Sequence, residues 1–323
     1  MNFELFRSPT PRAALLWLPA LGVPARKYER LASVLADSGI VCQLHEWRGT
    51  GRHPLRASRS QDWGYRELLL EDIPTSLAEL RVRHPGLPLL LGGHSIGAQF
   101  AVLGAALHGG VAGLVGIGSG IPHWRLFSSP QRWLVAGFAH ALPILTRVLG
   151  YYPGDRLGFA GREAGQLMRD WAQTVRRGHY DGLPGLPERF GERLVALDLP
   201  FLGLCLGADQ LVPLASQQAL IATTRSRAVR ERVLDAATLG TVPDHFAWMR
   251  EPAAVAHEIA VPEVGVGQVD PDPRLGPEQR EDRRPVGDDL VEHHEIEYCR
   301  RGAIGEFVGH EVNKISGAGE GHN

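Results

Sequence analysis

The stretch Gly93-His94-Ser95-Ile96-Gly97 decides the fold of this 323-residue chain. A short apolar run, 87–91, precedes it and predicts a buried strand; small and apolar residues at 96–107 follow and predict a packed helix. A serine at the apex of a strand–turn–helix unit fits the G-x-S-x-G elbow, whose tight turn leaves no room for a Cβ two residues either side. We therefore expect Ser95 to present an exposed hydroxyl beside a helix N-terminus, which favours developing negative charge.

Strand and helix patterns alternate around this unit. Further apolar segments predict strands at 13–18, 40–44, 111–118, 201–206 and 232–236. Helical spacing predicts helices at 25–37, 65–83 and 214–224, and a last one running from His245 towards Ile259. Such alternation is typical of an α/β fold with a mostly parallel sheet and helices on both faces. In these folds the site lies at the carboxyl ends of the strands, where Ser95 is predicted to stand.

The alternation stops between about residues 121 and 195, where aromatic and apolar residues are spread over helical-looking segments. One interpretation is a helical lid that shapes an apolar substrate pocket. The other is an added helical layer whose aromatic residues form its own core. Within this insertion the most membrane-like segment, Trp133 to Leu149, is interrupted by His140, Pro143 and Arg147, so no membrane span is expected.

Composition changes again after Val261. Residues 262–323 are rich in Asp, Glu, Arg, Pro and Gly and poor in aromatic residues, which predicts a disordered C-terminal tail. The predicted organisation is thus one domain over residues 1–261 and a tail over 262–323. The tail can be a natural extension or a read-through or out-of-frame end, and the sequence does not separate these.

The overall composition describes an ordinary globular protein, with 44% hydrophobic residues and a net charge of −2. No basic surplus indicates a nucleic-acid partner. Three scattered cysteines predict buried free thiols rather than disulfides or a zinc site, and no cluster of ligand residues indicates a metal or cofactor. The N-terminus lacks a basic region followed by an apolar one, so no signal peptide is visible and a cytoplasmic location is expected.

A serine nucleophile needs a general base that a third group orients. With a G-x-S-x-G elbow the chain order is Ser, then an acid, then His. We select His245, just after the last strand and its loop, because His179 falls in the insertion and His257 in the final helix pattern.

For the acid we select Asp209, which directly follows the strand at 201–206 and could reach the imidazole. Its alternative role is an Asx turn that closes the loop. Asp235 on the next strand is the rival, and Asp244 is too close to His245 in sequence to orient it easily. For the oxyanion hole we select two backbone N–H groups, that of Ile96 and that of Leu21 in the loop after the strand at 13–18.

From Ala13 to Ile259 the chain resembles the α/β-hydrolase superfamily, and most closely the serine aminopeptidase-like and monoacylglycerol-lipase-like branch of bacterial hydrolases. The resemblance is carried by the Ser95 motif, Arg48-Gly49-Thr50-Gly51, Gly207-Ala208-Asp209 with Val212-Pro213, and His245. Many members have His-Gly in the oxyanion loop, where this chain has Pro19-Ala20. The backbone donor survives this difference.

These residues favour a serine hydrolase of esterase or lipase type. It would cleave an ester, thioester or amide of a small molecule with an apolar acyl part through an acyl-enzyme. Two other functions stay open: a hydrolase fold kept as a binding module, and an acyltransferase with the same triad.

Overall fold

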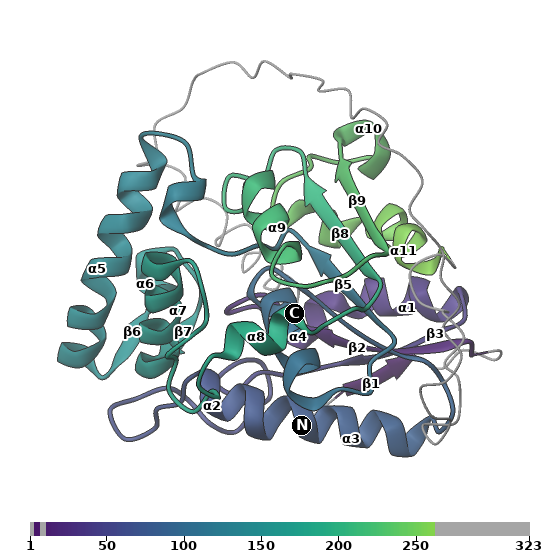
Figure 1. The fold of residues 1–323 in the computed structure, drawn as a ribbon, viewed down its shortest axis with the longest axis horizontal. Helices are drawn as coiled ribbons and strands as arrows, with labels where there is room; N and C mark the ends of the chain where they lie inside the picture. Colours follow the sequence, from purple (N-terminus) through teal and green to yellow (C-terminus); the bar gives the residue numbers. More distant parts are fainter. Residues whose placement is uncertain (1–2, 7–10, 262–323) are drawn as a thin grey trace, which may run out of the picture. The chain divides into compact units, whose positions relative to one another are not determined.

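The structure, a computed structural model, describes residues 3–6 and 11–261 of the chain (Figure 1). The predicted tail at 262–323 lies outside these residues, as does Cys299. The other two cysteines, Cys42 and Cys205, are buried free thiols, as their apolar neighbours predict.

A seven-stranded sheet forms the centre of the described chain. Its order is β1-β3-β2-β4-β5-β8-β9. Only β1 runs antiparallel to its neighbour β3; all other pairs are parallel. The strands are β1 (Phe3–Phe6), β2 (Ala13–Leu18), β3 (Ile40–Leu44), β4 (Leu89–His94), β5 (Gly113–Ile117), β8 (Phe201–Leu206) and β9 (Val229–Leu234). This confirms the predicted α/β fold and adds β1, which the sequence pattern did not reveal.

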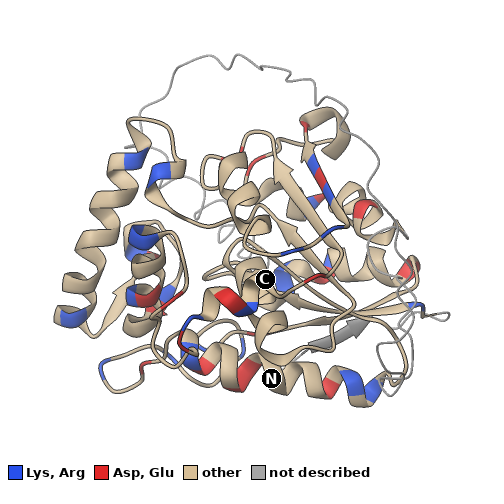
Figure 2. Cartoon of the chain, viewed as in Figure 1, with Lys and Arg blue, Asp and Glu red and all other residues tan. Residues whose placement is uncertain are grey.

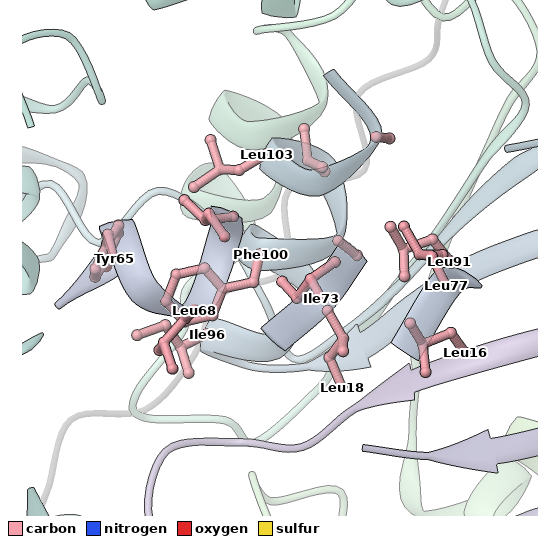
Figure 3. Close-up of a cluster of buried hydrophobic side chains, with 14 of the residues drawn as sticks. Leu16, Leu18, Tyr65, Leu68, Ile73, Leu77, Leu91, Ile96, Phe100 and Leu103 are labelled. Atoms are coloured by element: carbon pink, nitrogen blue, oxygen red, sulfur yellow. The ribbon is translucent and has the colours of Figure 1, made fainter. Parts of the chain in front are cut away.

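Helices cover both faces of the sheet because both faces of its central strands are apolar. Along β2, Leu16 and Leu18 belong to one core and Leu15 and Trp17 to the other. The first core also takes the helices around the serine motif, and Figure 3 shows their side chains interleaved. These are α2 (Tyr65–Glu67), the π-turn η2 (Leu68–Asp72), α3 (Ile73–Arg83) and α4 (Ile96–His108). The second core takes η1 (Ala25–Tyr28), α1 (Glu29–Asp37), α10 (Ala236–Leu239), η4 (Ala247–Arg250) and α11 (Ala253–Ala260), while α9 (Leu214–Ile221) packs on β8.

The strand order reverses between β2 and β4. After β2 the chain forms β3, which pairs with β2 on one side, and then crosses over to form β4, which pairs with β2 on the other side. Crevices at the carboxyl ends of strands that flank such a reversal are the usual ligand sites of open α/β sheets. Here those ends carry Pro19 to Leu21 and Ser95.

The insertion between β5 and β8 differs from the all-helical expectation, because it contains a β-hairpin between two long helices. Its elements are η3 (Trp124–Leu126), α5 (Gln131–Leu149), β6 (Tyr151–Pro153), α6 (Gly154–Leu157), β7 (Arg162–Ala164), α7 (Gly165–Arg177) and α8 (Phe190–Val195). Helices α5 and α7 pack against each other around a small core of their own, which includes Leu142, Tyr152 and Met168.

The last predicted helix is also divided. His245 lies in a turn, η4 follows, and α11 begins only after Pro252. Proline has no N–H for an i→i−4 bond and disfavours a helix interior, and Pro252 stands instead directly before the first residue of α11.

Candidate active site

Ser95 occupies a strained turn between β4 and α4. Its backbone torsions are φ 55° and ψ −125°, and a positive φ is uncommon for a residue with a side chain. Its N–H donates to the carbonyl of Ile117 at 2.9 Å, and its carbonyl accepts from Ser119 Oγ at 2.6 Å. Both bonds fix the serine against the end of β5.

The flanking glycines permit this turn by letting backbone approach backbone. A Cβ at Gly97 would lie 2.0 Å from the carbonyl oxygen of Leu18, and one at Gly93 would lie 2.5 Å from the same oxygen. These distances are impossible for carbon, so neither position tolerates a side chain. Without side chains, Gly93 and Gly97 let the Leu18 carbonyl at the end of β2 lie directly against the first turn of α4.

Asp209 and His245, selected as acid and base, meet in the structure. His245 Nδ1 lies 2.6 Å from Asp209 Oδ2, with 4% and 0% of the two side chains exposed. The other oxygen, Oδ1, accepts the N–H groups of Leu211 and Val212 at 2.7 and 3.1 Å. Asp209 therefore closes the Asx-type turn and contacts the imidazole at once. A carboxylate at Nδ1 holds the proton there and leaves Nε2 as an acceptor.

This pair packs against the serine turn. The His245 ring lies 4.6 Å, centroid to centroid, from that of His94, the residue before Ser95. On the β5 side, a Cβ at Gly118 would come within 3.2 Å of Asp209 Oδ2 and 3.4 Å of His245 Nδ1. The fold thus brings Ser95, Asp209 and His245 to one edge of the sheet from three separate loops.

The other candidate acids serve local structure. Asp235 accepts from the N–H and the hydroxyl of Thr238 and so caps α10. Asp244 accepts from the N–H groups of Phe246 and Ala247 and thereby shapes the turn that carries His245.

The loop after β2 is held from several sides. The Trp47 indole N–H donates to the Pro19 carbonyl at 2.9 Å, and the N–H of Ala25 donates to Glu46 Oε1 at 3.0 Å. In the described residues the N–H groups of Leu21 and Ile96 have no acceptor within the protein. Leu21 and Ile96 line the same small cavity. Two unpaired backbone donors beside one cavity are what an oxyanion hole requires.

Sequence reasoning missed two groups that join these parts, Tyr28 and His94. The Tyr28 hydroxyl accepts the N–H of Ala20 at 3.0 Å and lies 2.9 Å from His94 Nδ1. Burial lowers the pKa of His94 well below its usual value, so the ring is neutral. Because the Tyr28 oxygen already accepts from Ala20, its O–H is available to donate a hydrogen bond to His94 Nδ1. The sequence indicates Tyr28 only as one position in the helical spacing of residues 25–37. The position of His94 inside the motif was the one signal of a further role.

The cavity beside Leu21 and Ile96 has mainly apolar walls, but one carboxyl group faces it. Glu163, from β7 of the insertion, is 3% exposed and accepts the N–H of Gly161 at 3.1 Å. Burial raises its pKa to about 7. The remaining walls include Trp47, Trp63, Leu68, Phe100 and Leu167.

The hairpin that carries Glu163 also touches the oxyanion loop. A Cβ at Gly22 would lie 2.3 Å from the nitrogen of Gly161 and 2.8 Å from the carbonyl carbon of Ala160. The insertion is therefore in direct contact with the candidate site.

Comparison with known proteins identifies a family and several solved structures that this chain resembles. A family profile described as serine aminopeptidase, S33, matches residues 9–238, well over half of the chain. A monoglyceride lipase from Saccharomyces cerevisiae, solved with a substrate analogue, has 15% identity and a TM-score of 0.58, over 82% of this chain and 91% of that one. A monoacylglycerol lipase from Paleococcus ferrophilus has 17% identity and a TM-score of 0.54, over 80% and 97%.

One curated relative adds a sequence match. The monoglyceride lipase homolog of monkeypox virus is 27% identical over 95 residues, which are 29% of this chain. The match spans 33% of the viral protein's length. The chain belongs to the serine aminopeptidase S33 family of α/β-hydrolases, which confirms the superfamily that its motifs predicted.

Proposed function

We propose that the protein is a serine hydrolase that cleaves carboxylic esters with an apolar acyl part through an acyl-enzyme. One observation carries this proposal. The buried side chains of Asp209 and His245 form a hydrogen bond of 2.6 Å, and the His245 ring packs on His94, the residue before the strained Ser95. A triad is recognised by such geometry and roles rather than by sequence position.

Each residue has one chemical task in this proposal. Ser95 Oγ attacks the ester carbonyl while His245 Nε2 takes its proton. His245 then gives that proton to the leaving alcohol, and water repeats the sequence to release the acid. Asp209 stabilises the imidazolium, and the N–H groups of Leu21 and Ile96 stabilise the oxyanion.

An ester with an apolar acyl part is favoured over other substrates by the walls of the site. The cavity next to the oxyanion donors is small, about 10 Å³, and most of its walls are aromatic and aliphatic side chains, with Arg48, Thr50 and Glu163 among them. An acyl group that enters here between the insertion and the elbow would meet mainly apolar surface. The names of the relatives point the same way, because three of them are monoglyceride lipases or homologues of one. Contact between the insertion and Gly22 supports its role as a lid over this pocket.

Labelling with a fluorophosphonate probe tests the nucleophile. The wild-type protein should take up one probe at Ser95, located by peptide mass spectrometry. Ser95→Ala should take up none, whereas Ser128→Ala, which alters an exposed serine, should label normally. An unlabelled wild-type protein with an intact melting transition would support a binding module instead.

Hydrolysis of p-nitrophenyl esters of increasing acyl length tests the substrate class. We expect kcat/KM to rise from acetyl to a medium-length chain, and Ser95→Ala to lose at least about 10³-fold. Aminoacyl nitroanilides provide the amide arm, and their preference over esters would contradict the proposal. Acyl transfer to an added alcohol in place of hydrolysis would identify an acyltransferase.

A further inference from the structure

Helix α5 of the insertion exposes an unusual number of large apolar side chains. Among its residues, Trp133, Leu134, Ile144 and Val148 are 62%, 49%, 67% and 61% exposed. A soluble surface tolerates single exposed apolar residues, but a contiguous group of them marks an interaction site. Among the described residues, no helix is long and apolar enough to span a membrane.

The four side chains form one stripe. At 100° per residue, all four positions fall within an arc of about 100° around the helix, and Gly137 and Ala141 fall inside the same arc. The opposite side of α5 carries the buried residues Ala139, Leu142 and Thr146, which face the core of the insertion. Packing within the protein therefore accounts for one face of α5 and leaves the apolar stripe uncovered in the described chain.

The surroundings of the stripe are basic. Helix α5 contains Arg132 near its start, Arg147 near its end and no acidic residue, and Figure 2 shows blue near both ends of the helix and no red on it. At the end near Trp133, the ring of Trp124 lies 5.3 Å from that of Trp133, and the exposed Arg125 lies over Trp124 at 5.1 Å. At the other end, the exposed Arg59 donates to the carbonyl of Val148.

The part of the insertion around α5 and α7 has the same sign, and the full insertion, residues 121–195, contains ten arginines and six acidic residues. Between residues 121 and 178 it contains eight arginines and three acidic residues. Two of the three, Glu163 and Asp170, are buried, and burial raises the pKa of each. Between residues 121 and 178, Asp155 is therefore the one exposed acidic residue among the described side chains, whereas Arg125, Arg147 and Arg156 are exposed.

We propose that α5 docks the protein on an anionic lipid surface, with the stripe in the acyl region and the arginines at the headgroups. An amphipathic helix with an aromatic residue on one face and basic residues beside it binds membranes in this way, lying in the plane of the interface. A second copy of this chain fits less well, because pairing two such stripes would bring arginines of like charge together. The proposal does not depend on the catalytic activity and can be tested without it.

Sedimentation of the full chain with vesicles tests the docking. The vesicles are phosphatidylcholine alone, or phosphatidylcholine with about one third phosphatidylglycerol. We expect at least 10-fold tighter binding to the anionic vesicles. The double variant Trp133→Gln, Ile144→Gln should bind about 10-fold more weakly, and Arg125→Gln, Arg147→Gln should lose the preference for phosphatidylglycerol.

The matched control is Val82→Gln. Val82 is 81% exposed on α3, outside the insertion, so its replacement should leave vesicle binding unchanged. All variants alter exposed residues, and thermal melts should match the wild type. Wild-type protein that stays in the supernatant with both vesicle types overturns the proposal. The proposal is also overturned if Val82→Gln loses as much vesicle binding as the stripe variant does. A third contrary result is a concentration-dependent dimer in sedimentation velocity that the stripe variant abolishes, because a second copy of the chain would then cover the stripe.

Discussion

At the scale of single residues, Asp209 shows how one carboxylate can serve structure and chemistry together. Oδ1 holds the turn through two N–H groups and Oδ2 contacts His245. The proposed catalytic role and the alternative role as a turn residue are therefore both present, on different oxygens. A substitution that keeps the turn acceptor and removes the charge can separate them.

Asp209→Asn is that substitution. The amide oxygen can still accept from the turn, but a neutral side chain cannot stabilise the imidazolium, and its NH₂ disfavours the required tautomer. We expect ester hydrolysis to fall by about 10³- to 10⁴-fold while the melting temperature changes little. Asp235→Asn, at the exposed cap of α10, is the control and should keep full activity. An active Asp209→Asn enzyme would remove Asp209 from the triad.

Glu163 gives a prediction on pH and stability. Its pKa is raised to about 7 in the folded protein, so the native state holds this proton more tightly than the unfolded chain does. Stability from this group is present at low pH and is lost as pH rises from about 4.5 through 7, by about 3 kcal/mol.

Glu163→Gln should remove this dependence, because the amide oxygen can still accept from Gly161 and carries no charge. Urea denaturation at pH 5 and pH 8 measures it. The variant should gain stability relative to the wild type on going from pH 5 to pH 8. If the variant and the wild type differ in unfolding free energy by the same amount at pH 5 and at pH 8, the protonation of Glu163 does not contribute to stability between these pH values, and the prediction is wrong.

At the scale of elements, the β4–α4 elbow depends on close backbone contact. Gly97→Ala would place a Cβ 2.0 Å from the Leu18 carbonyl oxygen, so the loop after β2 must move. We expect a loss of several kcal/mol in unfolding free energy, and of activity. Gly137→Ala is the matched control on exposed α5, where a Cβ meets nothing within 4 Å, and should stabilise by about 0.5–1 kcal/mol. Chemical denaturation of both variants decides the comparison.

The sequence predicted elements best where one strong pattern was sufficient. Buried strands such as 201–206 and the helical stretch 65–83 were predicted with the bounds the structure has, because apolar runs and 3.6-residue spacing are local signals. Strand β1 and the β6–β7 hairpin were missed because segments of three or four residues form strands only through their partners. The Tyr28–His94 contact was missed because its two residues are 66 positions apart and meet only in the folded chain.

At the scale of the whole molecule, the last described helix, α11, packs into the second core. Val255, Ala256 and Ile259 of α11 are buried in the second core, and Arg12 donates to the carbonyl of Ala260. The final helix is thus anchored to the start of β2. This arrangement makes the C-terminal boundary of the domain a testable proposal.

Truncation after Val261 tests that boundary. The composition of residues 262–323 provides little apolar surface to offset the cost of ordering, roughly 1–2 kcal/mol per residue. We expect the truncated protein to melt within about 2 °C of the full chain and to keep its ester hydrolysis, since a change of 1 kcal/mol would shift the melting temperature by about 2–4 °C in a domain of this size. Limited proteolysis of the full chain should cut first within these residues. A truncated protein that melts several degrees lower, or that loses ester hydrolysis, would contradict this boundary.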